Sequence, residues 1–184
     1  LIGTIPTGGS GVYTYQWQMS TDNVNWSNLS ATSQNYQPSI LTTSTWFRRM
    51  ESNTCGNYNS NTVKITVSAE LIPGSILPLT QTICYGTQPA QLISSSATGG
   101  TGDYNYQWQQ SADNFNWTDI GSATSQNYQP PVSTTSKWYR VKITSSGCNE
   151  IFSYSVNVDV YPQINPGTIY TDQTICYETQ PSLL

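Results

Sequence analysis

The chain has 184 residues, of which only 9% are charged, and its formal net charge is −4 at pH 7. Six lysines and arginines cannot form the basic stripe that nucleic acid or an anionic membrane surface requires, so we expect neither partner. Histidine is absent, which excludes Ser-His-Asp and Cys-His constellations, and we expect no enzyme activity and no cofactor in this segment. No apolar run approaches the roughly 18 residues of a membrane span, so we expect no membrane insertion, and any secretion signal would lie upstream.

The sequence repeats a unit of about 92 residues roughly twice. The block Ala31–Pro38 returns letter for letter as Ala123–Pro130, and the block Gln81–Tyr85 reappears as Gln173–Tyr177. Three tryptophans of one copy also recur in the next: Trp17, Trp26 and Trp46 become Trp108, Trp117 and Trp138. A chain with such internal repetition is typical of a tandem array.

The repeat divides the chain into three parts. We interpret residues 1–70 as a first copy that lacks its opening strands, residues 71–162 as a complete copy, and residues 163–184 as the opening segment of a third copy. The connector at Pro73-Gly74, repeated as Pro166-Gly167, is short and contains proline, so we expect it to hold neighbouring copies semi-rigidly.

Alternating apolar and polar residues predict β-strands throughout, and no segment has helical spacing. Along residues 137–144 the alternation places Tyr139, Val141 and Ile143 on the inner face, with Trp138 and Arg140 on the outer face. About seven short strands in each copy indicate an antiparallel β-sandwich. For the complete copy, the predicted strands cover residues 83–87, 91–97, 104–110, 117–120, 126–129, 137–144 and 151–161.

The tryptophans differ in what their positions predict. Trp17 and Trp108 lie in mid-strand and are predicted to fill the core. Trp26 and Trp117 each follow a polar turn. One interpretation is that they fill the core or cover a sheet edge, and the other is that their exposed ring faces stack on sugars. Trp138 is a further candidate glycan contact, and stacking of Arg140 on its ring is the alternative.

An Asp-Asn-x-Asn turn occurs in both copies. Its oxygens make Asp22 and Asn25, with Asp113 and Asn116, weak candidates for a calcium site. The alternative is a hairpin whose Asp and Asn side chains bond to their own backbone. We favour the hairpin, because an all-protein calcium site generally uses more carboxylates than one turn supplies.

Each full copy carries two cysteines. Pairing within the complete copy joins Cys84 to Cys148, whereas pairing between copies would join Cys55 to Cys84 and Cys148 to Cys176. A strand of about ten residues, roughly 33 Å, separates Cys55 from the connector, whereas a disulfide needs Cα atoms within about 7 Å. We therefore predict a Cys84–Cys148 disulfide, partners outside this window for Cys55 and Cys176, and an oxidising, extracytoplasmic location. Four reduced thiols are the alternative.

Several motifs resemble a known class of repeat. Ile83–Pro89, Ala97–Gly102, Tyr106–Gln109 and Ala123–Pro130 resemble segments of the Ig-like repeats of Bacteroidota cell-surface proteins. SprB-type gliding-motility adhesins and related type IX-secreted giant adhesins are the kind most similar. The resemblance implies tandem Ig-like sandwiches outside the cell, attached to the outer membrane through another region.

The function that follows is structural. We expect a stalk or filament segment of a large secreted adhesin, with neighbouring repeats of the same polypeptide as partners and surface polysaccharide or another adhesion substrate as a further candidate. The alternative is a carbohydrate-binding Ig-like module of a secreted protein or enzyme.

Overall fold

The computed structural model describes residues 1–169 and 172–183. Residues 170, 171 and 184, which belong to the expected opening segment, lie outside the described part. Within that part every regular element is a β-strand, and no helix is long and apolar enough to cross a membrane. Contacts separate the chain into two compact units: Leu1–Ile72 with Ala97–Tyr104 and Ser145–Asn149, and Pro73–Ser96 with Asn105–Thr144 and Glu150–Leu184.

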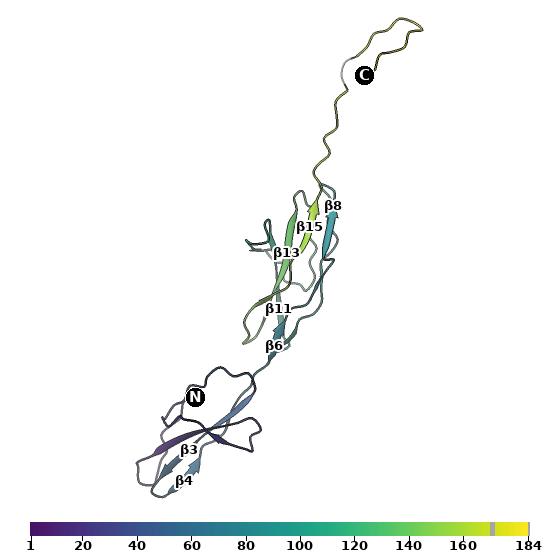
Figure 1. Ribbon diagram of the computed structural model, residues 1–184. Coiled ribbons are helices and arrows are strands. Elements are labelled where there is room, and N and C mark those ends of the chain that lie inside the picture. The colour runs from purple at the N-terminus through teal and green to yellow at the C-terminus, as the bar shows by residue number, and fades with distance from the viewer. Residues whose placement is uncertain (170–171, 184) are drawn as a thin grey trace. The chain divides into compact units, whose positions relative to one another are not determined.

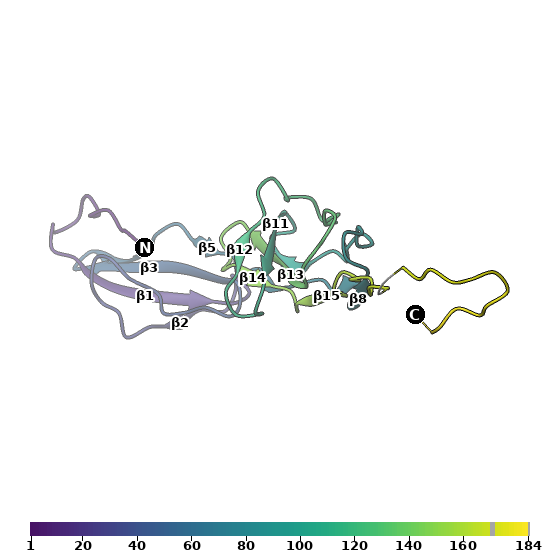
Figure 2. The same cartoon turned by 90° about the horizontal axis from the view of Figure 1, so that it is seen from above.

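The first copy folds around one antiparallel sheet. Its strands are β1 (Thr14–Ser20), β2 (Ser27–Asn28), β3 (Thr45–Asn53), β4 (Gly56–Asn59) and β5 (Val63–Ile65). Strand β1 lies between β2 and β3, and both β4 and β5 pair with the far side of β3. Figure 2 shows β1 and β3 running alongside each other, and their register places Trp17 opposite Arg49.

Strands β6 (Ala69–Ile72) and β10 (Thr98–Gly100) form a short antiparallel pair of their own. The pair requires glycine at position 99, whose φ is +76°. A Cβ atom there would lie 1.8 Å from the backbone oxygen of Glu70. Leu71 of β6 is buried beside this close approach.

The complete copy is built on a larger sheet. Besides β6 and β10, its strands are β7 (Ile76–Leu77), β8 (Thr80–Ile83), β9 (Ile93–Ser94), β11 (Tyr104–Ser111), β12 (Thr118–Asp119), β13 (Lys137–Ser145), β14 (Ile151–Phe152) and β15 (Val156–Val160). The order in the sheet is β12-β11-β13-β15-β8, with β14 also on β13. Strands β13, β15 and β8 lie side by side in Figure 1, and β8 runs parallel to β15.

A second layer covers the inner face of this sheet. It consists of the β7–β9 pair and of the segment around Tyr128, which bridges to Leu92. Between the layers lie side chains with at most 2% exposure: Trp108, Tyr139, Val141, Ile143, Leu92, Val156 and Val158. The complete copy is thus an immunoglobulin-like β-sandwich, and the predicted all-β fold class is confirmed.

The same aromatic cluster forms both cores. Trp108 stacks on Tyr128 at 5.5 Å between ring centroids, and its indole N–H donates to the carbonyl of Ser125 at 3.0 Å. In the first copy Trp17 meets Tyr36 at 5.6 Å and donates to the carbonyl of Ser33. Each aromatic pair contributes about 0.5–1.5 kcal/mol beyond its burial. The predicted core positions of Trp17 and Trp108 are confirmed.

Four predicted strands differ from the observed ones. Of residues 91–97 only Ile93–Ser94 form a strand, β9. The strand predicted for residues 83–87 ends at Ile83, because Cys84 to Thr87 form a turn closed by the Thr87 N–H on the Cys84 carbonyl. Residues 126–129 make only an isolated bridge at Tyr128. Residues 151–161 split into β14 and β15 around Ser153.

A serine hydroxyl causes that split. The backbone N–H of Val141 donates to Ser153 Oγ at 3.0 Å, while the Ser153 N–H donates to the Val141 carbonyl at 2.9 Å. In the first copy Ser60 bonds to Arg49 in the same way. A side chain therefore replaces one rung of the strand ladder in both copies, as in a β-bulge.

Candidate functional site

The outer face of the first-copy sheet carries a chain of stacked and bonded side chains. The guanidinium of Arg48 lies 4.2 Å from the ring centroid of Trp26, and its Nε donates to Gln18 Oε1 at 2.7 Å. The amide of Gln18 then donates to Asn28 Oδ1 at 2.7 Å. Strands β1, β2 and β3 supply the polar groups from facing register positions, with Gln18 opposite both Asn28 and Arg48, and Trp26 lies just before β2.

The complete copy repeats this network with more charge. Arg140 lies 4.3 Å from the ring centroid of Trp117 and donates to Gln109 Oε1 at 2.7 Å. Gln109 is buried and donates to Asp119 Oδ1, while Lys142 bonds to the second oxygen of Asp119 at 3.3 Å. The hydrogen bond from Gln109 is the main cause that lowers the pKa of Asp119; burial acts in the opposite direction, and the hydrogen bond and charge of Lys142 each add a smaller lowering effect.

Trp26 and Trp117 are half-buried, and each is held by an arginine of its own copy. Arg140 also lies 4.1 Å from the ring centroid of Phe152, so it is held between two aromatic side chains. Burial lowers the pKa of Arg140, and Glu150 acts in the opposite direction, yet an arginine remains a cation in either case. Cation–π contacts of this kind contribute about 0.5–1 kcal/mol at exposed sites.

Trp138 does not take part in this network. It is half-buried on β13 opposite Asn157, and Arg140 stacks on Trp117 and Phe152 instead. The alternative that Arg140 covers Trp138 is therefore wrong, because Trp117, just before β12, and Phe152 of β14 take up this arginine. In the first copy, Lys64 lies 4.4 Å from the ring of Trp46.

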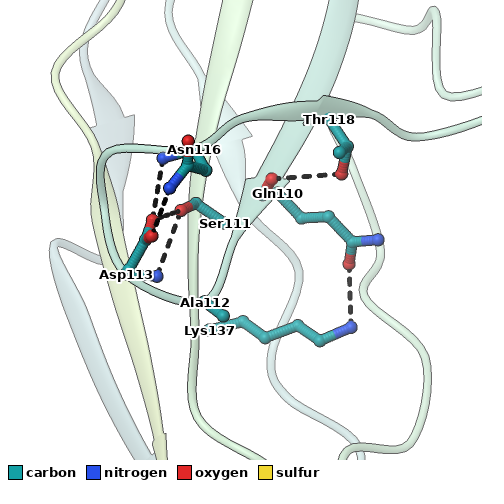
Figure 3. Close-up of a pocket in the computed structure, with 7 residues that line it drawn as sticks. All are labelled: Gln110, Ser111, Ala112, Asp113, Asn116, Thr118 and Lys137. Carbon is teal, nitrogen blue, oxygen red and sulfur yellow. Dashed lines mark hydrogen bonds between the residues drawn. The ribbon is translucent and has the colours of Figure 1, made fainter.

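The Asp-Asn-x-Asn turns have the same bonds in both copies. Asp113 Oδ1 accepts hydrogen bonds from Ser111 Oγ and from the backbone N–H groups of Phe115 and Asn116. Its Oδ2 accepts from the side-chain amide of Asn116 at 2.6 Å (Figure 3). These bonds, led by the Asn116 N–H, lower the pKa of Asp113 well below its usual value of 3.8.

Asp22 is bonded identically to Ser20, Val24 and Asn25, and its pKa is likewise lowered, chiefly by the Asn25 side chain. In each copy the aspartate carboxylate thus accepts four hydrogen bonds from protein donors, three at Oδ1 and one at Oδ2. In the complete copy Lys137 also lines the adjoining pocket of about 300 Å³ (Figure 3). Within the described residues no three His, Cys, Asp or Glu side chains gather as a metal site. The calcium alternative for Asp22, Asn25, Asp113 and Asn116 stays a prediction that would require these bonds to be replaced.

The sequence alone did not single out the tips of these turns or the glutamines that bond to the two arginines. Phe115 is 87% exposed and Val24 is 76% exposed, although both are apolar. The sequence feature that could have revealed them is the apolar residue at the third position of both Asp-Asn-x-Asn motifs. Gln18 and Gln109 were signalled only by the repeated Tyr-Gln-Trp-Gln block, which did not reveal their arginine partners.

Comparison with known families gives one match. A family described as a domain of unknown function, DUF8696, matches residues 2–69 and 73–162. The chain belongs to the DUF8696 family. The two matched segments correspond to two successive DUF8696 copies, separated by residues 70–72.

No curated protein matches this DUF8696 chain. Among solved structures it is similar to the three N-terminal domains of the bacteriophage RB49 Highly Immunogenic Outer Capsid protein (Hoc), with 11% identity and a TM-score of 0.49 over 83% of this chain and 58% of that chain. It is also similar to immunoglobulin domains 1–4 of Sidekick-1, with 16% identity and a TM-score of 0.35 over 87% of this chain and 42% of that chain. The DUF8696 chain thus spans less than two thirds of either structure.

The cysteines of the DUF8696 copies do not form the predicted pair. Cys55, Cys84, Cys148 and Cys176 are all free. The prediction assumed that the segment at Cys84 approaches the turn before the last strand. Instead, β8 runs parallel to β15, with Ile83 opposite Val160, so Cys84 follows the end of β15. Cys148 precedes β14, and the ten residues from 151 to 160 extend roughly 30 Å between the two positions if fully extended.

Proposed function

We propose that this DUF8696 segment is a structural repeat of a large secreted cell-surface adhesin, in which successive sandwiches form a stalk that projects an adhesive region. Attachment is its expected role, with gliding motility of a type IX-secreting Bacteroidota cell as the more specific setting. The supporting observation is that both copies bond their outer-face polar groups internally. Arg48 and Arg140 each bond to a glutamine of the same copy and stack on its tryptophan.

A spacer needs a fold that repeats, stays soluble and carries no reacting groups. The low content of charged residues and the hydrogen bonds that Asp22 and Asp113 accept within their own turns suit that role. The chain also contains no histidine, so we infer that the segment is not an enzyme and requires no cofactor. Its partners would be neighbouring repeats of the same polypeptide.

A replacement experiment in the parent protein tests the spacer role. Residues 71–162 are exchanged for an unrelated Ig-like sandwich of similar length, and a second strain carries a deletion of the same residues. We expect the exchange to preserve cell attachment and the deletion to reduce it, because a stalk depends on length and not on surface chemistry. Loss of attachment in the exchanged strain, with normal surface display, would overturn the proposal.

The extracellular location is tested separately. Protease treatment of intact cells should release peptides from residues 1–184, because the segment is proposed to lie outside the outer membrane. A cytoplasmic marker protein must stay intact in the same samples. Release of the peptides only after cell lysis would contradict the location.

Carbohydrate binding is the second candidate, favoured by the half-exposed Trp26 and Trp117 at equivalent positions. Binding of the purified chain to a glycan array, lost in Trp26→Ala/Trp117→Ala and retained in Phe115→Ala, would support stacking on these rings. Phe115 is the matched control, because it is an exposed aromatic residue outside the arginine network. Trp138→Ala tests the third candidate contact. Under the spacer proposal the wild-type chain binds no glycan.

A further inference from the structure

The two cysteines of the complete copy lie at opposite ends of its sheet. Cys84 follows β8, whose last residue, Ile83, is opposite Val160 at the end of β15 (Figure 1). The N–H of Val160 donates to Ser136 Oγ, just before β13 begins. Cys148 lies beyond the other end of β13, a strand of nine residues that extends about 30 Å. The fold therefore keeps these two cysteines too far apart for a disulfide with each other.

Cys84 lies where the chain leaves the complete copy. Strand β15 is the last strand of that copy, and the N–H of Tyr161, the residue after it, donates to the Ile83 carbonyl at 2.9 Å. The residue before Cys84 is thus in direct contact with the exit of the chain. The side chain of Cys84 is exposed at this end of the copy.

Cys148 lies where the chain enters the same copy. Strand β6 begins at Ala69, which is opposite Gly100 of β10. The next residue, Thr101, donates its N–H to Ser145 Oγ at 3.0 Å. The carbonyl of Ser145 in turn accepts the Cys148 N–H at 3.0 Å. The turn that carries Cys148 therefore adjoins the start of β6.

The division of the chain into compact units agrees with this position. Residues 145–149, which include Cys148, fall in one compact unit with Leu1–Ile72, which contains the first copy and β6. The turn of Cys148 thus belongs with the part of the chain that precedes its own copy.

The exit of one copy and the entry of the next are adjacent in the sequence. Residues 156–162 align with residues 63–69 of the first copy, so Pro162 is the counterpart of Ala69. Pro162 directly follows Tyr161, the residue at the exit. Because one residue spans at most about 3.6 Å, no linker separates the exit from the entry. The cysteine at the exit of one copy and the cysteine at the entry of the next therefore belong to the same junction.

Both kinds of cysteine recur with their turns. The N–H of Thr87 donates to the Cys84 carbonyl, and that of Thr179 donates to the Cys176 carbonyl, at 3.2 Å each. Cys55 follows β3 of the first copy as Cys148 follows β13 of the complete copy. The repeat thus supplies one cysteine to the junction before a copy and one to the junction after it.

We propose that disulfide bonds join successive copies, each between the cysteine after β8 of one copy and the turn cysteine after β13 of the next. Cys84 then bonds to the counterpart of Cys148 in the following copy, and Cys148 bonds to the counterpart of Cys84 in the preceding copy. This inference rests on the extracellular location proposed above, because disulfides persist in oxidising compartments.

Formation of each bond is a two-electron oxidation, for which the oxidant is a carrier protein with a disulfide of its own. The thiolate of one cysteine attacks the carrier disulfide and forms a mixed disulfide. The thiolate of the other cysteine then attacks the sulfur of the first cysteine and displaces the carrier. The two copies gain one S–S bond, and the carrier leaves as a dithiol with the two electrons and two protons that the thiols lose.

Two serine variants of the parent protein distinguish this pairing from pairing within one copy. Free thiols are alkylated in denaturant, the protein is digested with pepsin without reduction, and mass spectrometry identifies alkylated and linked cysteines. Cys84→Ser should leave Cys148 in a disulfide and create one free thiol, at the turn cysteine of the following copy. Cys148→Ser should leave Cys84 in a disulfide. Pairing within one copy would instead free the second cysteine in each variant.

Cleavage of the connector gives a readout on the otherwise unaltered protein. A recognition site for a sequence-specific protease is inserted between Pro166 and Gly167. A disulfide from Cys84 to the following copy bridges this site, so the cut protein should migrate as one species without reductant and as two species after reduction. With Cys84→Ser added, the two pieces should separate without reductant.

Three results would each overturn the inference. The first is a peptide in which Cys84 is linked to Cys148. The second is alkylation of both cysteines in protein that an external protease reaches on intact cells. The third is separation of the pieces of cut, unreduced protein that retains Cys84. None of these results alters cell attachment, so the spacer role stands or fails by its own replacement experiment.

Discussion

The two copies place different kinds of side chain at the same core position, an apolar one in the complete copy and a charged one in the first copy. On β13 of the complete copy, Val141 is fully buried beside Ile143. On β3 of the first copy, Arg49 occupies the place of Val141 and is only 3% exposed. Glu51, in the place of Ile143, lies 2.5 Å from the Arg49 guanidinium.

The arginine is tolerated because each of its three guanidinium nitrogens donates at least one hydrogen bond. Besides Glu51, it donates to the carbonyls of Gln34 and Thr4 at 2.6 Å each, and it lies 4.3 Å from the ring of Tyr15. A buried charge is costly unless it is paired and hydrogen-bonded. This core position therefore accepts either an apolar or a charged side chain, provided that the charged one is paired and hydrogen-bonded.

The largest expected effect comes from placing the charge where it has no partner. Val141→Arg puts a guanidinium beside Ile143, with no carboxylate in the place of Glu51. We expect a loss of about 3–5 kcal/mol in the free energy of unfolding, as for other unpaired buried charges. Urea denaturation measures the loss, and hydrogen exchange should localise it to residues 137–145. An unchanged midpoint would show that the core can rearrange around the arginine.

The reciprocal change tests whether the ion pair stabilises the first copy. Arg49→Val/Glu51→Ile recreates the apolar pair of the complete copy. We expect stability between unchanged and about 1–4 kcal/mol higher, because buried ion pairs are often replaced by apolar residues without loss. Arg49→Val alone is the control and should be destabilising, since Glu51 then loses its partner. A double variant less stable than the single one would contradict this reasoning.

A smaller effect is expected at the serine that splits the last strand. Ser153→Ala leaves the buried N–H of Val141 without an acceptor, which costs about 1–3 kcal/mol. Ser60→Ala removes the same bond to Arg49 and should cost a similar amount. Urea denaturation of both variants checks the equivalence of the copies. A cost confined to one variant would mean that the bulge is needed in only one copy.

The smallest expected effect is a loss of folding stability at acidic pH. The pKa values of Asp22 and Asp113 are lower in the folded chain than in the unfolded one, because the carboxylates accept hydrogen bonds. Their stabilisation is therefore present above the unfolded pKa, about 3.9, and is lost as the pH falls toward the folded pKa. Denaturation between pH 5 and pH 2, roughly the window in which these carboxyls titrate, should show this loss for wild type. It should be reduced in Asp22→Asn/Asp113→Asn.

The same variants decide the calcium alternative. If the turns act only through their own hydrogen bonds, addition of calcium or of EDTA at neutral pH leaves the thermal midpoint unchanged. A midpoint raised by calcium in wild type, and not in Asp22→Asn/Asp113→Asn, would establish a cation site at these turns.

Local patterns were enough to predict much of the fold. Alternation along residues 137–144 gave the inner face of β13, and the mid-strand position of Trp108 indicated its burial. The direction in which β8 joins the sheet could not be read in this way, because alternation is the same for parallel and antiparallel neighbours. That missing direction led to the wrong pairing of Cys84 with Cys148.

The candidate site was predicted less completely. The repeat drew attention to Trp26 and Trp117, but the arginine partners depend on a register between strands far apart in sequence. Gln109 is opposite Asp119 only because β12 folds back on β11. Such cross-strand networks have no local signature, and the outer-face alternation alone suggested Trp138 as the partner of Arg140.

The parallel pairing of β8 with β15 determines how a pulled molecule would resist extension. Tension along the polypeptide would enter β8 at Thr80 and leave β15 at Val160, which lie at opposite ends of the paired segment. The two strands would then be sheared lengthwise, and the hydrogen bonds between them would have to break together. An antiparallel hairpin pulled at its open end unzips one bond after another, and this sandwich avoids that weakness through the direction of a single four-residue strand.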